Sequence, residues 1–155
     1  MKYKKLAKSL KGFNISWKNN GIFPKYKNIS GPLVSKKRIN RAKKIVKLIL
    51  KEEEVKIINA FKMLVKKKYD SKKTVNVDIE SAIECVNNTV LSKESDDIYG
   101  ESDGEKIWIS EVKMSDEYLV GTILHESLHH ICTLDGKDIC EKDEHYVMNY
   151  LGDDC

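Results

Sequence analysis

The sequence predicts an α+β fold in which a small sheet lies beside one helix that carries the candidate site residues. Apolar residues at helical spacing predict helix in residues 36–68, and a capped, largely apolar stretch predicts another helix at 116–133. Strand-like runs at 74–79 and 106–110 predict the sheet. With 155 residues, the chain is long enough for one domain with one modest core.

The chain divides into a basic N-terminal arm, residues 1–34, and a main domain, residues 35–155. Glycine and proline interrupt the arm, which shows no helical or strand periodicity. Lysines alternate in it with the aromatic residues Phe13, Trp17, Phe23 and Tyr26. These aromatic residues either form a strip that stacks on nucleic-acid bases or pack on the main domain, and we favour packing.

The first half of the main domain is predicted to be helical and basic on its outer side. Ser35 is a suitable N-cap, and the stretch from about Lys36 to Lys68 repeats apolar residues at three- and four-residue spacing. The acidic run at 52–54 interrupts the lysines and is a candidate break between two helices.

The second half alternates short strands, loops and helices. Ser115 is the expected N-cap of the helix that carries the site residues, and Asp135-Gly136 marks the end of that segment. The elements expected in order are a strand at 74–79, a helix or strand at 81–90, an acidic loop at 92–104, a strand at 106–110, a helix at 116–133 and a last helix at 142–151. The strand at 107–110 is a candidate to pair with an extended substrate.

Charge is segregated along the chain. Residues 1–73 hold 23 Lys and Arg against 4 Asp and Glu, whereas residues 74–155 hold 5 against 20. The overall net charge is only +4. The basic half indicates either an anionic partner, such as nucleic acid bound without sequence preference, or a solvated helix face that balances the acidic half.

The sequence contains no sign of a membrane or secretory segment. No apolar run approaches the roughly 18 residues of a membrane span, and no apolar stretch follows the basic start of the chain. We therefore expect an intracellular protein with no membrane partner. The four cysteines include no Cys-x-x-Cys pair, so we expect free thiols rather than a structural zinc site.

The run His125-Glu126-Ser127-Leu128-His129 is the main chemical signal. Two histidines four residues apart differ by only about 40° around a helix axis, so His125 and His129 can bind one Zn²⁺ from the same face. Glu126 stands beside the first ligand and can accept the proton of a metal-activated water. The pattern therefore predicts hydrolysis with Glu126 as general base and a peptide as the expected substrate.

A catalytic zinc site of this type needs a third protein ligand. Glu144 and His145 follow His129 by 15 and 16 positions, on the predicted last helix, and either is a candidate. Glu141 is a weaker candidate. Asp135 stands where the metzincin pattern has its last ligand, but Cys132 replaces the glycine of that pattern.

Residues 98–151 resemble the compact zincin domains of phages and large DNA viruses, which are similar to the SprT-like and ImmA/IrrE-like peptidases. The resemblance is carried by the strand at 107–109, the run from Thr122 to His130, and Glu144-His145-Tyr146-Val147. It implies a viral zinc metalloprotease with a zincin-like fold across residues 35–155 and a ligand on the helix after the motif. The small-gluzincin pattern Glu-x-x-Val implies Glu144 as that ligand, and the SprT-like pattern implies His145. We take Glu144 as the predicted third ligand.

The expected function is therefore that of a zinc-dependent metallopeptidase acting on a protein or peptide. Two alternatives give more weight to the basic half. The first is a nucleic-acid-associated protein that uses the zincin fold as a scaffold, and the second is a protease recruited to nucleic acid by residues 1–73. The intact Glu126 argues against a scaffold, because a scaffold has no need of a general base.

If the lysines of residues 1–73 form a continuous surface, the full chain should bind duplex DNA with little sequence preference. Each phosphate contact releases counterions, so the log–log slope of affinity against salt should be about −0.9 per contact. A salt-series binding titration measures this slope. The Glu126→Gln variant should bind equally well, because the residue lies outside the basic half, and absence of binding even at low salt would remove the nucleic-acid hypothesis.

Overall fold

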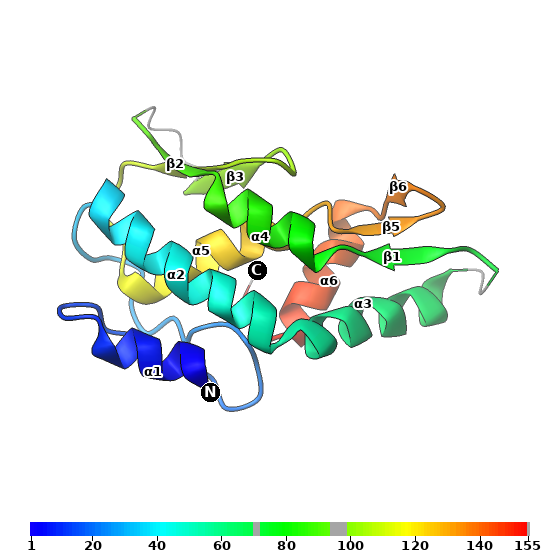
Figure 1. The fold of residues 1–155 in the computed structure, drawn as a ribbon, viewed down its shortest axis with the longest axis horizontal. Coiled ribbons are helices and arrows are strands. Elements are labelled where there is room, and N and C mark those ends of the chain that lie inside the picture. The colour runs from blue at the N-terminus through cyan, green and yellow to red at the C-terminus, as the bar shows by residue number, and fades with distance from the viewer. Residues whose placement is uncertain (70–71, 94–98, 155) are drawn as a thin grey trace.

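The structure is a computed structural model that describes residues 1–69, 72–93 and 99–154. The described residues form a mixed α+β fold of six helices and two small sheets (Figure 1). The elements are α1 (Lys2–Ser9), α2 (Lys36–Glu52), α3 (Glu54–Lys68), β1 (Val75–Val77), α4 (Ile79–Asn87), β2 (Thr89–Ser92), β3 (Gly100–Ser102), β4 (Ile107–Ser110), α5 (Asp116–Leu128), β5 (Cys132–Leu134), β6 (Lys137–Asp138) and α6 (Glu141–Tyr150). The predicted α+β class is confirmed at this level. Within the described residues, no helix is both long and apolar enough to cross a bilayer.

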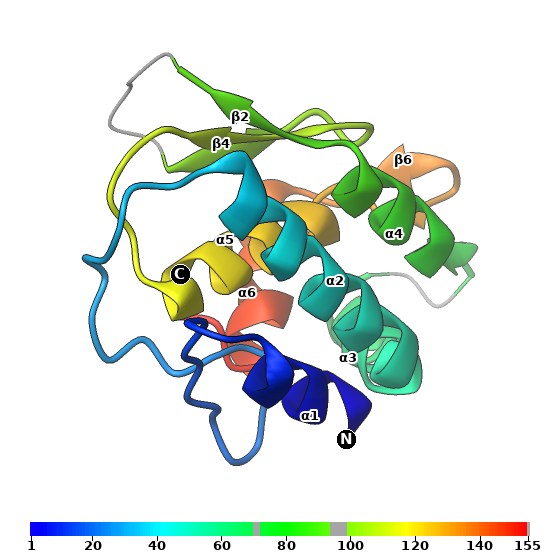
Figure 2. The same ribbon diagram turned by 60° about the vertical axis from the view of Figure 1, so that its left-hand side comes forward.

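Helix α5 is buried at the centre of the fold, because other elements cover most of its sides. It packs on α2 and α4, and it also contacts β3, β4 and α6 (Figure 2). Apolar side chains on the faces turned inward are fully buried, among them Leu119, Val120, Ile123, Leu124 and Leu128. This burial fixes the direction in which the remaining, more open face of α5 points.

The sheet beside α5 has the strand order β2-β4-β3. β4 pairs in parallel with β2 and antiparallel with β3. The predicted strand at 107–110 is therefore the central strand, and the idea that it pairs with a substrate is wrong, because both of its edges are already paired. β3 is the edge strand that contacts α5.

Several elements differ from the sequence prediction: α1 lies in residues 1–34, where the sequence predicts no helix, and β3 lies within the expected loop at 92–104. The undecided segment 81–90 is split between α4, capped by the Asp78 side chain, and the start of β2. The acidic run contains the break between α2 and α3, as predicted. Helix α5 ends at Leu128 rather than near residue 133, because His129 is extended and His130 has a φ of 68°. The chain then turns into β5.

The N-terminal segment packs into the same hydrophobic core as the rest of the chain. Phe13 and Phe23 are buried there, which confirms the packing alternative for these two aromatic residues. The Glu52 carboxylate accepts hydrogen bonds from the backbone N–H groups of Lys2 and Tyr3, at 3.1 and 2.7 Å. Donors at the start of a helix have no partner within the helix, so this contact fixes α1 to the end of α2.

Residues 18–22 of the same segment hold the C-terminal end of the chain. The N–H of Ile22 donates to the carbonyl of Leu151 at 2.8 Å. The Lys18 ammonium donates to the carbonyl of Gly152 and to the carboxylate of Asp154, both at 2.6 Å. Gly21 makes this approach possible, because a Cβ there would lie 2.6 Å from the Leu151 carbonyl oxygen.

We predict that Gly21→Ala destabilises the protein by about 1–3 kcal/mol, the usual range for overpacking. The new methyl group meets backbone atoms, which cannot rotate away as a side chain can. Chemical denaturation of both proteins measures the difference in the free energy of unfolding. Asn20→Ala, an exposed change at the next position, is the control and should stay within about 0.5 kcal/mol. Equal stability of the two variants would show that the contact between residue 21 and the C-terminal end is unimportant.

Candidate metal centre

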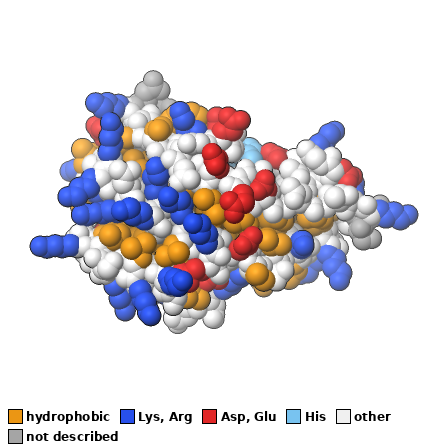
Figure 3. Space-filling view, viewed as in Figure 1, with side chains coloured by type: hydrophobic (Ala, Val, Ile, Leu, Met, Phe, Trp, Pro, Cys, Tyr) orange, Lys and Arg blue, Asp and Glu red, His pale blue; other side chains and the backbone are white. Residues whose placement is uncertain are grey.

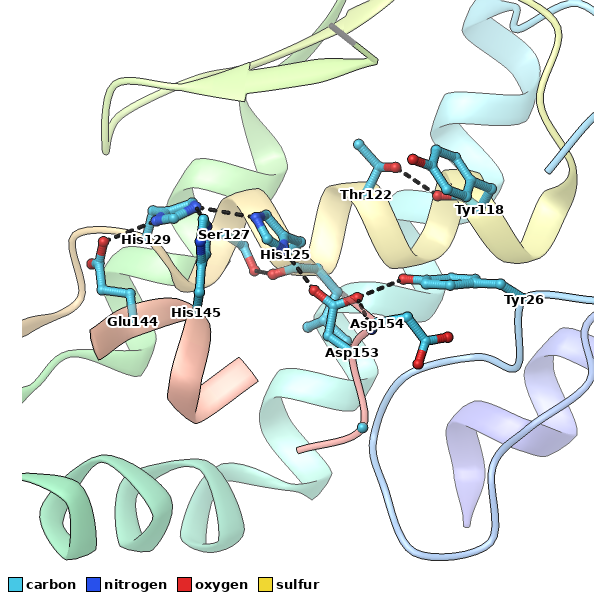
Figure 4. A network of polar contacts seen from close by, with 12 residues as sticks. Tyr26, Tyr118, Thr122, His125, Ser127, His129, Glu144, His145, Asp153 and Asp154 are labelled. Atoms are coloured by element: carbon cyan, nitrogen blue, oxygen red, sulfur yellow. Dashed lines mark hydrogen bonds and ion pairs between the residues drawn. The ribbon is translucent and has the colours of Figure 1, made fainter. Parts of the chain in front are cut away.

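Three imidazoles meet at the open face of α5 (Figure 4). His125 lies in the last turn of α5 and His129 is its C-cap, whereas His145 comes from α6. The Nε2 atom of His129 is 3.2 Å from Nε2 of His125 and 3.3 Å from Nε2 of His145. Among the His, Cys, Asp and Glu residues that the structure describes, these three form a group that could hold a metal ion, because their ligand atoms all lie within 4.8 Å of one another.

Two buried carboxylates face the opposite nitrogens of the α5 histidines. Asp153 Oδ2 is 2.5 Å from Nδ1 of His125, and Glu144 Oε1 is 2.9 Å from Nδ1 of His129. A carboxylate only accepts hydrogen bonds when ionised, so each contact assigns the imidazole proton to Nδ1. In the neutral rings, Nε2 of His125 and His129 then carries a lone pair that points into the cluster.

This arrangement fits a metal ion. Lone pairs on neighbouring Nε2 atoms repel one another unless a cation lies between them, and neutral imidazoles are common ligands of Zn²⁺. Carboxylates that accept the second N–H of a ligating histidine are a usual feature of such sites. Three protein nitrogens would also leave the open fourth position that catalytic zinc sites have.

The structure places Glu144 and His145 in different roles. The Glu144 carboxylate is already used by Nδ1 of His129 and by the backbone N–H of His130, which donates to Oε2 at 2.8 Å. The Glu144 carboxylate thus lies on the Nδ1 side of the His129 ring, whereas Nε2 of His145 lies 3.3 Å from Nε2 of the same ring, inside the cluster. The geometry therefore favours the alternative, His145, over the predicted third ligand, Glu144.

The weaker candidates, Glu141 and Asp135, lie outside the cluster, and so does His130. Glu141 is exposed, 3.8 Å from Nε2 of His145. His130 contacts Asp138 at 2.7 Å, on the outside of the molecule. Asp135 accepts the backbone N–H of Thr74 at 2.8 Å, so it holds β1 against the turn after β5.

Burial and charge shift the pKa values at the centre in different directions. Burial raises the pKa of the Glu126 carboxyl above its ordinary value, although the nearby His125 and His129 oppose this shift. Burial and the same two histidines lower the pKa of His145. Burial also lowers the pKa of His129, but the hydrogen bond and charge of Glu144 outweigh it and the net shift is upward. Glu126 is therefore a carboxylate that takes up a proton more readily than an exposed glutamate.

Two pockets adjoin residues of the cluster. His125 and Glu126 line one of about 550 Å³, which continues along α5 towards its N-terminus. His145 lines another of about 540 Å³, together with side chains of α3 and α6.

Sequence reasoning missed Asp153 and Tyr26. The Tyr26 hydroxyl donates to Oδ1 of Asp153 at 3.0 Å, while Oδ2 of the same carboxylate faces His125 (Figure 4). Asp153 follows His125 by 28 positions, in a polar end of the chain with no spacing that relates it to the motif. Contacts of residues 151–154 with the N-terminal segment, together with the hydrogen bond from the Asp153 N–H to the carbonyl of Met148 in α6, bring it into place.

Comparisons with models of known families, with curated proteins and with solved structures found no match for this chain. A function has therefore to be inferred from the side chains at the centre and from their surroundings.

We predict that Asp153→Asn weakens zinc binding by about 10- to 100-fold, the usual cost of losing such a partner of a ligating histidine. The amide keeps the size of the side chain but loses the negative charge that faces Nδ1 of His125. Competition with a chelator of known affinity measures the change. Asp154→Asn is the matched control, since Asp154 is the more exposed carboxylate and pairs with Lys18. Equal zinc affinity of Asp153→Asn and the unmodified chain would contradict the role of Asp153.

Proposed function

We propose that this protein is a zinc-dependent peptidase, with His125, His129 and His145 as metal ligands and Glu126 as general base. One observation carries the proposal. Three imidazoles converge on one point while Glu126, the residue after the first of them, lines the pocket that opens beside that point. A metal site with only a structural role does not need a carboxylate in an adjoining pocket.

Zinc is the metal that this donor set supports best. The ligands are three neutral imidazole nitrogens with no cysteine or carboxylate among them, and two of the rings are oriented by carboxylates. Zinc bound there would supply Lewis-acid chemistry, which polarises a carbonyl group and makes water more acidic.

Glu126 would move the proton. Its carboxylate takes a proton from the water that attacks the scissile carbonyl carbon and delivers it to the amide nitrogen as the C–N bond breaks. The amine product leaves with that proton, and Glu126 returns to its ionised form. The raised pKa of Glu126 suits both halves of this transfer, because the group must accept a proton and then release it.

The surroundings of the centre suit an extended peptide. β3 is an edge strand next to α5, so a substrate chain can add to the sheet through main-chain hydrogen bonds. The pocket beside His125 and Glu126 and the pocket beside His145 would then take side chains of the bound peptide.

The basic surface supports a second role, which is recruitment to nucleic acid. Exposed lysines lie along α1, α2 and α3, and Figure 3 shows Lys and Arg side chains crowded over the α1 and α2 side of one face. The metal ligands come from α5 and α6. Recruitment and hydrolysis would therefore use different elements of the fold.

We predict that Glu126→Gln keeps about one zinc per chain and the fold but lowers peptide hydrolysis by about 10²- to 10⁴-fold, the usual contribution of a general base. The amide has the same shape and cannot accept the proton. Metal analysis, circular dichroism and turnover of a casein substrate measure the three properties.

Glu105→Gln is the control, because it makes the same chemical change at an exposed position. Wild-type turnover in Glu126→Gln would refute the role of Glu126. Absence of zinc from the unmodified chain after loading and dialysis would refute the metal centre itself.

A further inference from the structure

The pocket beside His125 and Glu126 has aromatic walls. Tyr26 comes from the N-terminal segment, Tyr118 from the first turn of α5, and Tyr99 from the residue before β3. We call this hollow the tyrosine pocket. It is also lined by Ile29, Gly100, Gly121, Thr122, Asp153 and Asp154.

The three rings form one connected wall. Tyr118 is the middle member, with its ring centroid 5.4 Å from that of Tyr26 and 5.0 Å from that of Tyr99. These separations and the tilted planes are typical of favourable aromatic contacts. Three elements far apart in the sequence are thus brought together at one place beside the metal centre.

Gly121 makes room for the Tyr26 side of the pocket. Gly121 precedes His125 by one helical turn, and a Cβ on it would overlap the Tyr26 hydroxyl. With only a hydrogen atom there, the tyrosine ring lies close over α5 and its hydroxyl reaches Asp153 (Figure 4). The pocket therefore begins at the metal centre and runs along the helix.

The polar groups of the pocket are largely engaged already. The Asp153 oxygens contact His125 and Tyr26, and Asp154 pairs with Lys18. A positively charged side chain entering the pocket would have to compete with these partners. A negatively charged one would meet the carboxylates of Glu126, Asp153 and Asp154. Aromatic faces and the exposed Ile29 remain for an apolar side chain.

We propose that the tyrosine pocket binds an aromatic or large aliphatic side chain of the substrate, at the residue next to the cleaved bond. This inference rests on the proposed peptidase function, because the pocket is defined by its position beside His125 and Glu126. A pocket of about 550 Å³ is large enough for such a side chain. Burying it should favour a phenylalanine peptide over an alanine peptide by about 10- to 100-fold.

The preference should be one-sided. The pocket beyond His145 has one tyrosine, Tyr146, among charged and polar lining residues (Lys68, Glu141, Lys142 and Asn149), whereas three tyrosines line the tyrosine pocket. The stronger selection for an apolar side chain is therefore expected on one side of the cleaved bond.

The test uses the zinc-loaded full chain and quenched fluorescent peptides that differ only at the two positions flanking the cleaved bond, with Phe, Leu, Ala, Lys or Asp at each. At one position kcat/KM should be highest for Phe or Leu and lowest for Asp. Tyr99→Ala and Tyr118→Ala should each reduce the Phe-to-Ala ratio by about threefold or more. Tyr150→Ala, an exposed tyrosine outside both pockets, is the control and should leave the ratio unchanged.

A binding measurement separates this inference from the proposed function. The zinc-loaded Glu126→Gln protein should bind the Phe peptide more tightly than the Ala peptide by a similar factor, and Tyr99→Ala in that background should reduce the difference. Hydrolysis or binding with no preference for Phe or Leu over Ala, with a preference for Lys, or with a Phe-to-Ala ratio unaffected by Tyr99→Ala and Tyr118→Ala would overturn the tyrosine pocket. Selective binding by a protein that hydrolyses no peptide would instead overturn the peptidase and leave the pocket standing.

Discussion

The contacts between two buried carboxylates and two imidazoles are the interaction on which the site depends. Asp153 and Glu144 face Nδ1 of His125 and His129 and so direct both Nε2 lone pairs into the cluster. Without these contacts each ring could carry its proton on either nitrogen and turn about its side-chain bonds. The convergence with His145 would then be one arrangement among several, and the centre would bind a metal ion more weakly.

The two carboxylates come from different parts of the fold and are held in place by different contacts. Glu144 comes from α6, and its second oxygen accepts the N–H of His130 just beyond the end of α5, so the same side chain orients the His129 ring and stabilises the turn after it. Asp153 comes from the C-terminal end, which Ile22 and Lys18 hold in place. The N-terminal segment is thus part of the support of the candidate metal centre, and it also supplies Tyr26 to the tyrosine pocket.

The features that could be predicted from the sequence are those that depend on local residue patterns. The spacing of His125 and His129, the Ser115 cap and the α+β class all follow from patterns within a few residues. The choice between Glu144 and His145 depends on how α6 is rotated against α5, and that rotation is set by packing across the core. Asp153 and Tyr26 reach the centre only through tertiary contacts. The early end of α5 depends on the positive φ of His130, a conformation uncommon enough that helical periodicity does not reveal it.

The central claim is that three imidazoles, rather than two imidazoles and the Glu144 carboxylate, hold the metal. Zinc K-edge X-ray absorption of the full chain loaded with one zinc ion tests it most directly, because imidazole rings add a distinct outer-shell scattering signal. We predict scattering from three imidazoles, decreasing to two in the His145→Ala variant and staying at three in Glu144→Gln. Two imidazoles in the unmodified chain, with a signal unaffected by His145→Ala, would contradict the account.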